Sequence, residues 1–88
     1  MKIQQGQRRA IVIGASSGIG QRLARLLLHD GWFLGVAARR EAPLEQLAND
    51  FPGQVAWSCI DVTDEKAAEG LEQLVKKAGG MDLFLYAS

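Results

Sequence analysis

Gly14-Ala15-Ser16-Ser17-Gly18-Ile19-Gly20 follows a short apolar run, residues 10–13 (AIVI), and precedes a segment whose apolar residues recur at helical spacing. This order predicts a strand, a glycine-rich turn and a helix. Such a turn directs several backbone N–H groups, backed by the positive end of the helix dipole, at one point. The glycines let the backbone approach a ligand closely, and Ser16 and Ser17 add hydroxyl donors. The stretch therefore predicts a phosphate-binding site.

The rest of the chain alternates apolar runs with amphipathic segments. Further strands are predicted at residues 32–38 (WFLGVAA), 55–60 (VAWSCI) and 83–86 (LFLY), because each is a continuous apolar run. Uninterrupted apolar runs suit strands that are buried on both faces, and helices between them make parallel units with right-handed crossovers. We therefore predict an α/β fold, a Rossmann-type βαβαβαβ half-fold whose four-stranded parallel sheet has the order 3-2-1-4.

Three helices are predicted between these strands from the spacing of their apolar residues. The second spans residues 41–49, and the third is capped by Thr63 with acidic residues in its first turn. The predicted buried stripes are Ile19, Leu23, Leu26 and Leu27 in the first helix, Leu44, Leu47 and Ala48 in the second, and Leu71, Leu74, Val75 and Ala78 in the third.

Composition and charge narrow the classes of partner. Hydrophobic residues make up 48% of the chain and charged residues 23%, a mix typical of soluble globular proteins. Ten basic residues balance ten acidic ones, so no net field attracts nucleic acid or an anionic membrane. No signal segment and no membrane span of about 20 apolar residues is predicted. Cys59 is the only cysteine, which indicates a reducing, cytoplasmic compartment.

The letters GASSGIG, spaced Gly-x-x-x-Gly-x-Gly, resemble the glycine motif of the short-chain dehydrogenase/reductase family. The resemblance covers nearly the whole chain: Asp61-Val62 looks like that family's adenine-contacting dipeptide, and Asp82 precedes the fourth strand. It implies a bound dinucleotide cofactor. The residues implied to contact it so far are Gly14, Ser16, Ser17, Gly18, Ile19, Gly20, Asp61 and Val62. The alternatives are glycines that only permit a tight turn and an Asp61 that only forms a turn.

Arg39-Arg40 ends the second predicted strand, the position that separates the two nicotinamide cofactors. An acidic side chain there accepts bonds from the ribose 2′-OH and repels a 2′-phosphate, whereas arginine pairs with the phosphate. In NADP-preferring members of the family a basic residue matches Arg39, and Arg40 is a second donor. NADP is therefore the predicted cofactor, with NAD kept as the alternative because Glu41 follows.

Tyr86-Ala87-Ser88 occupies the first three positions of the family's Asn-Asn-Ala-Gly segment, so both asparagines are replaced. The family's catalytic serine and Tyr-x-x-x-Lys pair normally follow this point. The chain is thus expected to be a single truncated cofactor-binding domain over residues 1–88, inactive alone, from an NADP-dependent oxidoreductase acting on a carbonyl or alcohol. Neither Tyr86 nor Ser88 is predicted to be catalytic, and no metal site is predicted.

Two other readings stay open at this point. In the first, the chain is a non-catalytic module that binds a nucleotide. In the second, it is a self-associating fragment whose glycine turn binds nothing. The apolar fourth strand, Leu83, Phe84, Leu85 and Tyr86, has no charged residue beyond Asp82 to protect its edge. An unprotected strand edge favours pairing with a second copy, so a homo-oligomer is expected.

Overall fold

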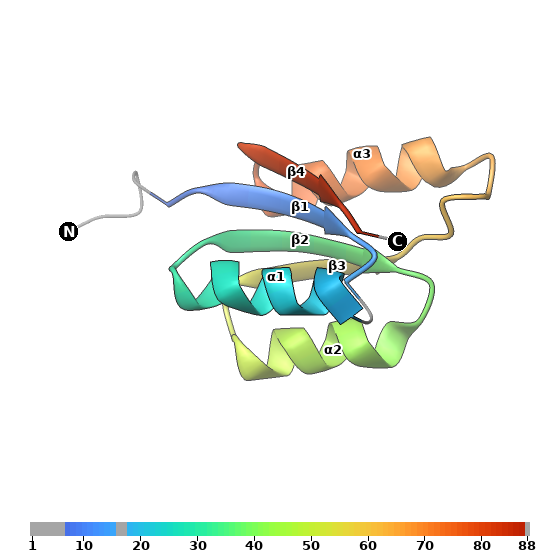
Figure 1. The fold of residues 1–88 in the computed structure, drawn as a ribbon. Coiled ribbons are helices and arrows are strands. Elements are labelled where there is room, and N and C mark those ends of the chain that lie inside the picture. Colours follow the sequence, from blue (N-terminus) through green and yellow to red (C-terminus); the bar gives the residue numbers. More distant parts are fainter. Residues whose placement is uncertain (1–6, 16–17, 88) are drawn as a thin grey trace.

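The predicted α/β architecture is present in the computed structural model, which describes residues 7–15 and 18–87 (Figure 1). Four parallel strands form one sheet in the order β3-β2-β1-β4, as the sequence predicts. The elements run β1 (Arg9–Ile13), α1 (Gly18–His29), β2 (Phe33–Ala38), α2 (Glu41–Asp50), β3 (Val55–Cys59), α3 (Ala67–Ala78) and β4 (Leu83–Tyr86).

Helices cover both faces of the sheet, which is why the central strands carry apolar residues on both sides. Helices α1 and α2 lie on one face and α3 on the other (Figure 1). On the first face Val12 of β1 shares a buried cluster with Leu28 and Leu44. On the second face Ile11 shares a cluster with Leu74. The residues of β1 from Ala10 to Ile13 thus alternate between two cores on opposite faces of the sheet.

The register brings the carboxyl ends of the strands together at one edge of the sheet. Ile13 of β1 lies beside Ala37 of β2 on one side and Tyr86 of β4 on the other. Ala38 lies beside Cys59 of β3. The loops that follow these residues therefore gather above the same edge, which is where ligands bind in open parallel sheets.

The face that α1 turns to the sheet differs from the predicted one. Gly20, Ala24 and Leu28 are its buried residues. Ile19 and Leu26 are 72% and 64% exposed, so the predicted stripe was wrong at these two positions. Small residues let the helix axis approach the sheet closely, and spacing of four keeps Gly20, Ala24 and Leu28 on one face.

The start of α3 also differs from its prediction. The helix begins at Ala67, with Lys66 as its N-cap, and Thr63 lies before it. Asp61 and Asp64 each accept a hydrogen bond from the backbone two residues on, so short turns occupy this segment. Aspartate side chains that bond to nearby backbone compete with the helix, which accounts for the later start.

Asp82 joins the starts of β4 and β1. Its carboxylate accepts a hydrogen bond from the backbone N–H of Arg9 at 2.9 Å, and its own N–H donates to the Arg9 carbonyl at 2.7 Å. The Arg9 side chain donates to the carbonyl of Ala78, at the end of α3. Asp82 therefore sets the register of β4, at the edge opposite the carboxyl ends of the strands.

Within residues 7–15 and 18–87, no helix is long and apolar enough to cross a membrane.

Candidate nucleotide-binding site

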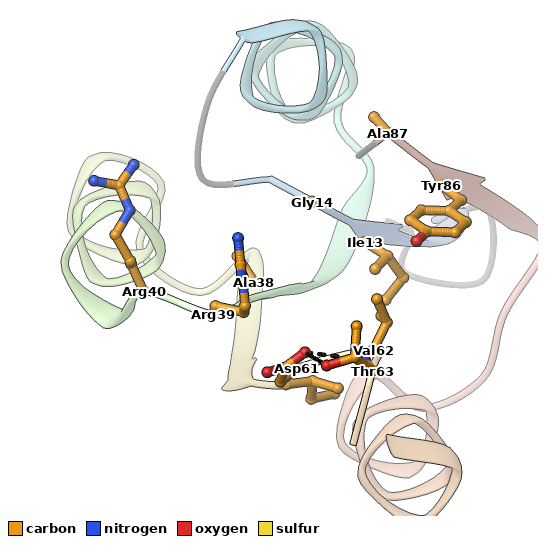
Figure 2. A pocket seen from close by; sticks show the side chains of 11 residues that line it. Ile13, Gly14, Ala38, Arg39, Arg40, Asp61, Val62, Thr63, Tyr86 and Ala87 are labelled. Carbon is orange, nitrogen blue, oxygen red and sulfur yellow. Dashed lines mark hydrogen bonds between the residues drawn. The ribbon is translucent and has the colours of Figure 1, made fainter. Parts of the chain in front are cut away.

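A cavity of about 750 Å³ lies at the carboxyl ends of the strands (Figure 2). Residues from all four strand ends contribute to it, as expected for a ligand site in a parallel sheet. Its walls are formed by Ile13, Gly14, Ala38, Arg39, Arg40, Ile60, Asp61, Val62, Thr63, Tyr86 and Ala87. The fold thus brings the predicted residues Gly14, Arg39, Arg40, Asp61 and Val62 into one place.

The turn after β1 is held by the neighbouring strand. The N–H groups of Gly14 and Ala15 both donate to the carbonyl of Ala37, at 2.8 and 3.3 Å. Gly14 has a φ of 87°, a conformation that favours glycine. These two N–H groups are therefore already used, whereas the N–H groups in the first turn of α1 have no partners within the helix.

Gly20 lets α1 begin directly behind this turn. A Cβ built on Gly20 would collide with the carbonyl oxygen of Gly14, so no other residue fits without moving the backbone. Beside Gly18, in contrast, a Cβ would have no neighbour within 4 Å among the described atoms. Gly18, Ile19 and Gly20 are at the helix start rather than in the cavity wall, and the predicted donors Ser16 and Ser17 lie outside the described residues.

Arg39 and Arg40 follow β2 and are both exposed on the cavity wall (Figure 2). Arg40 has extended backbone at the N-cap of α2, and Glu41 is already the first residue of that helix. Both arginines therefore lie in the connection between β2 and α2, whereas Glu41 belongs to the helix. Planar guanidinium groups in this position suit an anionic oxygen cluster such as a phosphate.

Asp61 is fixed by Thr63, which donates to its Oδ1 from both the backbone N–H and the hydroxyl. Both bonds lower the pKa of Asp61, and the bond from the Thr63 hydroxyl has the larger effect. The positive charge of Arg39 also lowers this pKa. Asp61 is thus a turn-forming aspartate, the alternative role predicted for it, and it also lies in the cavity wall. The turn presents Val62, which is 42% exposed.

The apolar side of the cavity contains residues that sequence reasoning did not assign to it. They include Ile13, Ile60, Tyr86 and Ala87. Tyr86 was predicted to be only a strand residue, yet it ends β4 beside Ile13 and is 59% exposed. The parallel register was the available signal, because the last residue of each strand must border the same edge.

These residues fit a nicotinamide dinucleotide. The cavity combines arginines for phosphate, a carboxylate for hydroxyl or amine groups, and apolar walls for a base. The open space at Gly18 adds room beside the helix start. A parallel sheet of order 3-2-1-4 with this glycine turn defines a Rossmann-type α/β chain.

Comparison with known proteins identifies the family. The family model for short chain dehydrogenases matches residues 8–87, so the chain belongs to the short-chain dehydrogenase family. L-xylulose reductase of Bos taurus is 33% identical over 85 residues, which are 97% of this chain and 33% of that protein. A probable 2,4-dienoyl-CoA reductase of Bacillus subtilis is 32% identical over 84 residues, 90% of this chain and 33% of that protein. The chain thus spans about a third of the length of these relatives.

Solved structures agree with this assignment. A short-chain dehydrogenase from Streptomyces avermitilis superimposes with a TM-score of 0.81 at 26% identity, covering 90% of this chain and 30% of that one. An alcohol dehydrogenase from Thermococcus sibiricus, complexed with 5-hydroxy-NADP, gives a TM-score of 0.80 at 30% identity. The match covers 89% of this chain and 35% of that one. The sheet order and helix placement are therefore those of the family.

Proposed function

We propose that this chain is the dinucleotide-binding part of an NADP-dependent short-chain oxidoreductase that transfers hydride to or from a carbonyl or alcohol. Membership of the family supports the oxidoreductase class. The relatives named as reductases and the alcohol dehydrogenase complexed with 5-hydroxy-NADP support the reaction type and the cofactor. Binding of the cofactor is proposed for this chain, and hydride transfer is proposed for a longer protein that contains it.

The pair Arg39 and Arg40 carries the choice of NADP over NAD. Both arginines line the cavity at the end of β2, where a 2′-phosphate on the adenosine ribose would lie. Glu41 follows within α2 and does not line the cavity. The charge facing the ribose is therefore positive, which favours the phosphorylated cofactor.

The residues of this chain bind and orient in the proposed reaction. The first turn of α1 receives the pyrophosphate, Arg39 and Arg40 pair with the 2′-phosphate, and Asp61-Val62 borders the base. The bound cofactor supplies the hydride or accepts it. The proton-transfer residues are assigned to a part of the protein beyond this chain, and neither Tyr86 nor Ser88 is given that role.

Calorimetric titration of NADPH and NADH into the 88-residue chain tests the cofactor choice. NADPH is expected to bind more tightly, and Arg39→Asp to reverse the preference by removing a phosphate partner and repelling the phosphate. Arg22→Asp, which makes the same charge change at an exposed position of α1, serves as the control. Equal affinity for both cofactors that Arg39→Asp leaves unchanged would refute the assignment of Arg39.

A second candidate function is a nucleotide-binding module without turnover. The cavity supports binding of a nucleotide. Hydride transfer measured with a chain that continues beyond Ser88 separates the two, since only the oxidoreductase consumes NADPH with a carbonyl substrate.

A cytoplasmic location remains part of the proposal because Cys59 is the only cysteine, and cell fractionation tests it.

Self-association through β4 is proposed as a property of this chain. In the described sheet β4 pairs with β1 along one edge, and its other edge is the end of the sheet. Phe84 and Tyr86 are 46% and 59% exposed beside it. A strand edge with exposed apolar residues favours pairing with another copy, which would cover Phe84, the one of the two that lies outside the cavity wall.

A further inference from the structure

The two ends of the cavity differ in chemistry (Figure 2). One end holds the side chains of Arg39 and Arg40, which follow β2. The other end is formed by apolar side chains and by the ring of Tyr86. A dinucleotide has the same division, because its phosphates are charged whereas the faces of its bases are flat and apolar.

Tyr86 is held at the apolar end by the backbone of β1. It ends β4 in register with Ile13, and the N–H of the next residue, Ala87, donates to the Ile13 carbonyl at 2.9 Å. The backbone is therefore fixed on both sides of Tyr86. Its side chain is nevertheless 59% exposed, so an aromatic face remains for a ligand to cover.

Val62 supplies further apolar surface from another element. It lies in the turn that Thr63 and Asp61 fix by two hydrogen bonds, and it is 42% exposed. Figure 2 shows Ile13 between the ring of Tyr86 and the chain of Val62. Two exposed apolar groups on fixed backbones, with Ile13 between them, form a surface that suits a flat aromatic base.

Building on the proposed function, we propose that Tyr86 is the aromatic wall of the adenine subsite, against which the base stacks. NADP and NAD share adenine, and Tyr86 therefore raises the affinity for both cofactors. Arg39, in contrast, distinguishes one cofactor from the other.

Four chains test this role in calorimetric titrations with NADPH and with NADH: wild type, Tyr86→Ala, Tyr86→Phe and Phe84→Ala. Loss of a base stack weakens binding by about tenfold or more. Tyr86→Ala is expected to do so for both cofactors, and Tyr86→Phe to retain the affinity because it keeps the ring. Phe84→Ala is the matched control, since Phe84 lies on the same face of β4 and outside the cavity wall.

A spectroscopic measurement reads the stack directly. Tyr86 is the only tyrosine of the chain, so a ring-labelled sample gives one set of tyrosine resonances. Adenosine 2′-phosphate and NADPH are expected to shift these resonances upfield through the ring current of adenine. Nicotinamide mononucleotide, which lacks adenine, is expected to leave them in place.

The outcomes separate this proposal from the proposed function. If the wild type binds NADPH but Tyr86→Ala binds as the wild type does, and the tyrosine resonances stay in place, the role of Tyr86 is refuted and the cofactor assignment stands. Absence of NADPH binding by the wild type would refute both. If Tyr86→Ala does not fold, the resonances of the wild type decide.

Discussion

Thr63 donates two hydrogen bonds to the same carboxylate oxygen of Asp61, one from its backbone N–H at 2.9 Å and one from its hydroxyl at 2.6 Å. The pair fixes a charged carboxylate on the cavity wall and forms the turn that presents Val62. Hydrogen bonds to the ionised form stabilise it. The residues after β3 are thus shaped by their own contacts, before any ligand binds.

We predict that Asp61 titrates below the ordinary aspartate pKa of 3.8 and that Thr63→Val raises its pKa towards that value. Because the folded pKa is the lowered one, the stability that these bonds contribute is present above pH 3.8 and is lost as the pH falls through the folded pKa. An NMR titration of the carboxyl carbon measures this. Thr63→Ser, which keeps the hydroxyl, is the control, and an unchanged pKa in Thr63→Val would contradict the account.

We predict that Gly20→Ala destabilises the chain by about 1–3 kcal/mol, as expected for overpacking of a close contact. Its Cβ would meet the carbonyl oxygen of Gly14, so α1 and the turn must separate. Thermal unfolding measures the loss. Leu26→Ala, at an exposed position of the same helix, is expected to change stability little. If Gly20→Ala melted with the wild type, the close approach of helix and turn would be disproved.

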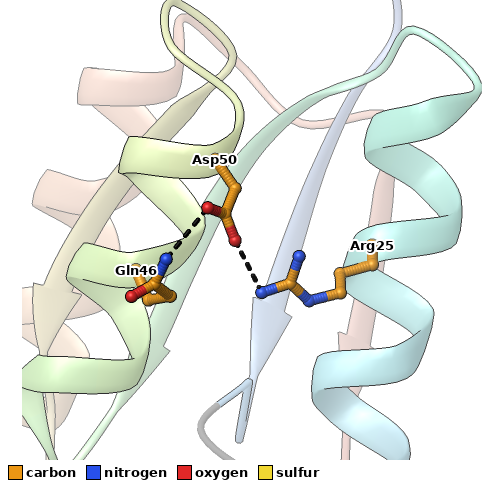
Figure 3. A network of polar contacts seen from close by, with 3 residues as sticks. All are labelled: Arg25, Gln46 and Asp50. Carbon is orange, nitrogen blue, oxygen red and sulfur yellow. Dashed lines mark hydrogen bonds and ion pairs between the residues drawn. The ribbon is translucent and has the colours of Figure 1, made fainter.

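Arg25 of α1 and Asp50 of α2 form an ion pair at 2.9 Å, and Gln46 donates to the same carboxylate (Figure 3). The bond from Arg25, and then that from Gln46, lowers the pKa of Asp50. We predict that Asp50→Asn lowers the melting temperature slightly at neutral pH, and less in high salt, because the pair is on the surface.

The same pair has a predicted pH dependence. Because the pKa of Asp50 is lowered in the folded chain, the ion pair contributes to stability above pH 3.8. This contribution disappears as the pH falls through the pKa of Asp50 in the folded chain. The melting difference between wild type and Asp50→Asn is therefore expected to vanish in strong acid. Glu45→Gln, at an exposed position of α2, is the control. A difference that persisted in acid would contradict the role of the Asp50 charge.

We predict that Phe84→Lys weakens self-association, because a charge on β4 opposes edge-to-edge pairing. Sedimentation over a range of concentrations measures the effect. The wild type is expected to form a dimer whose population rises with concentration, and Phe84→Lys to remain largely monomeric. A wild type that stays a folded monomer at high micromolar concentration would refute the proposed dimer.

The sequence predicted the sheet order and the residues of β4 because continuous apolar runs and glycine turns depend on local chemistry. It failed for the buried face of α1, where Leu26 is exposed and Ala24 is buried. The helix approaches the sheet through small residues there, and hydrophobicity alone does not reveal that approach. The start of α3 was missed because side-chain bonds from Asp61 and Asp64 replaced the helical turn.

The cavity was predicted in part. Gly14, Arg39 and Asp61 were assigned from their places after strands, and the fold brings them together. Tyr86 was predicted only as a strand residue, because no local motif marks it as part of the site. Its place beside Ile13 follows from the strand register, a property of the whole sheet rather than of a local motif.

We propose that the edge of the sheet where the strands end binds a nicotinamide dinucleotide. Titration of NADPH into the ¹⁵N-labelled chain, followed by amide chemical shifts, measures this binding residue by residue. We expect the shifts to concentrate at Gly14, Gly18, Arg39, Val62 and Ala87, whereas amides at the opposite ends of the strands, such as Asp82, stay in place. Shifts spread evenly over the chain, or confined to residues away from the cavity, would contradict it.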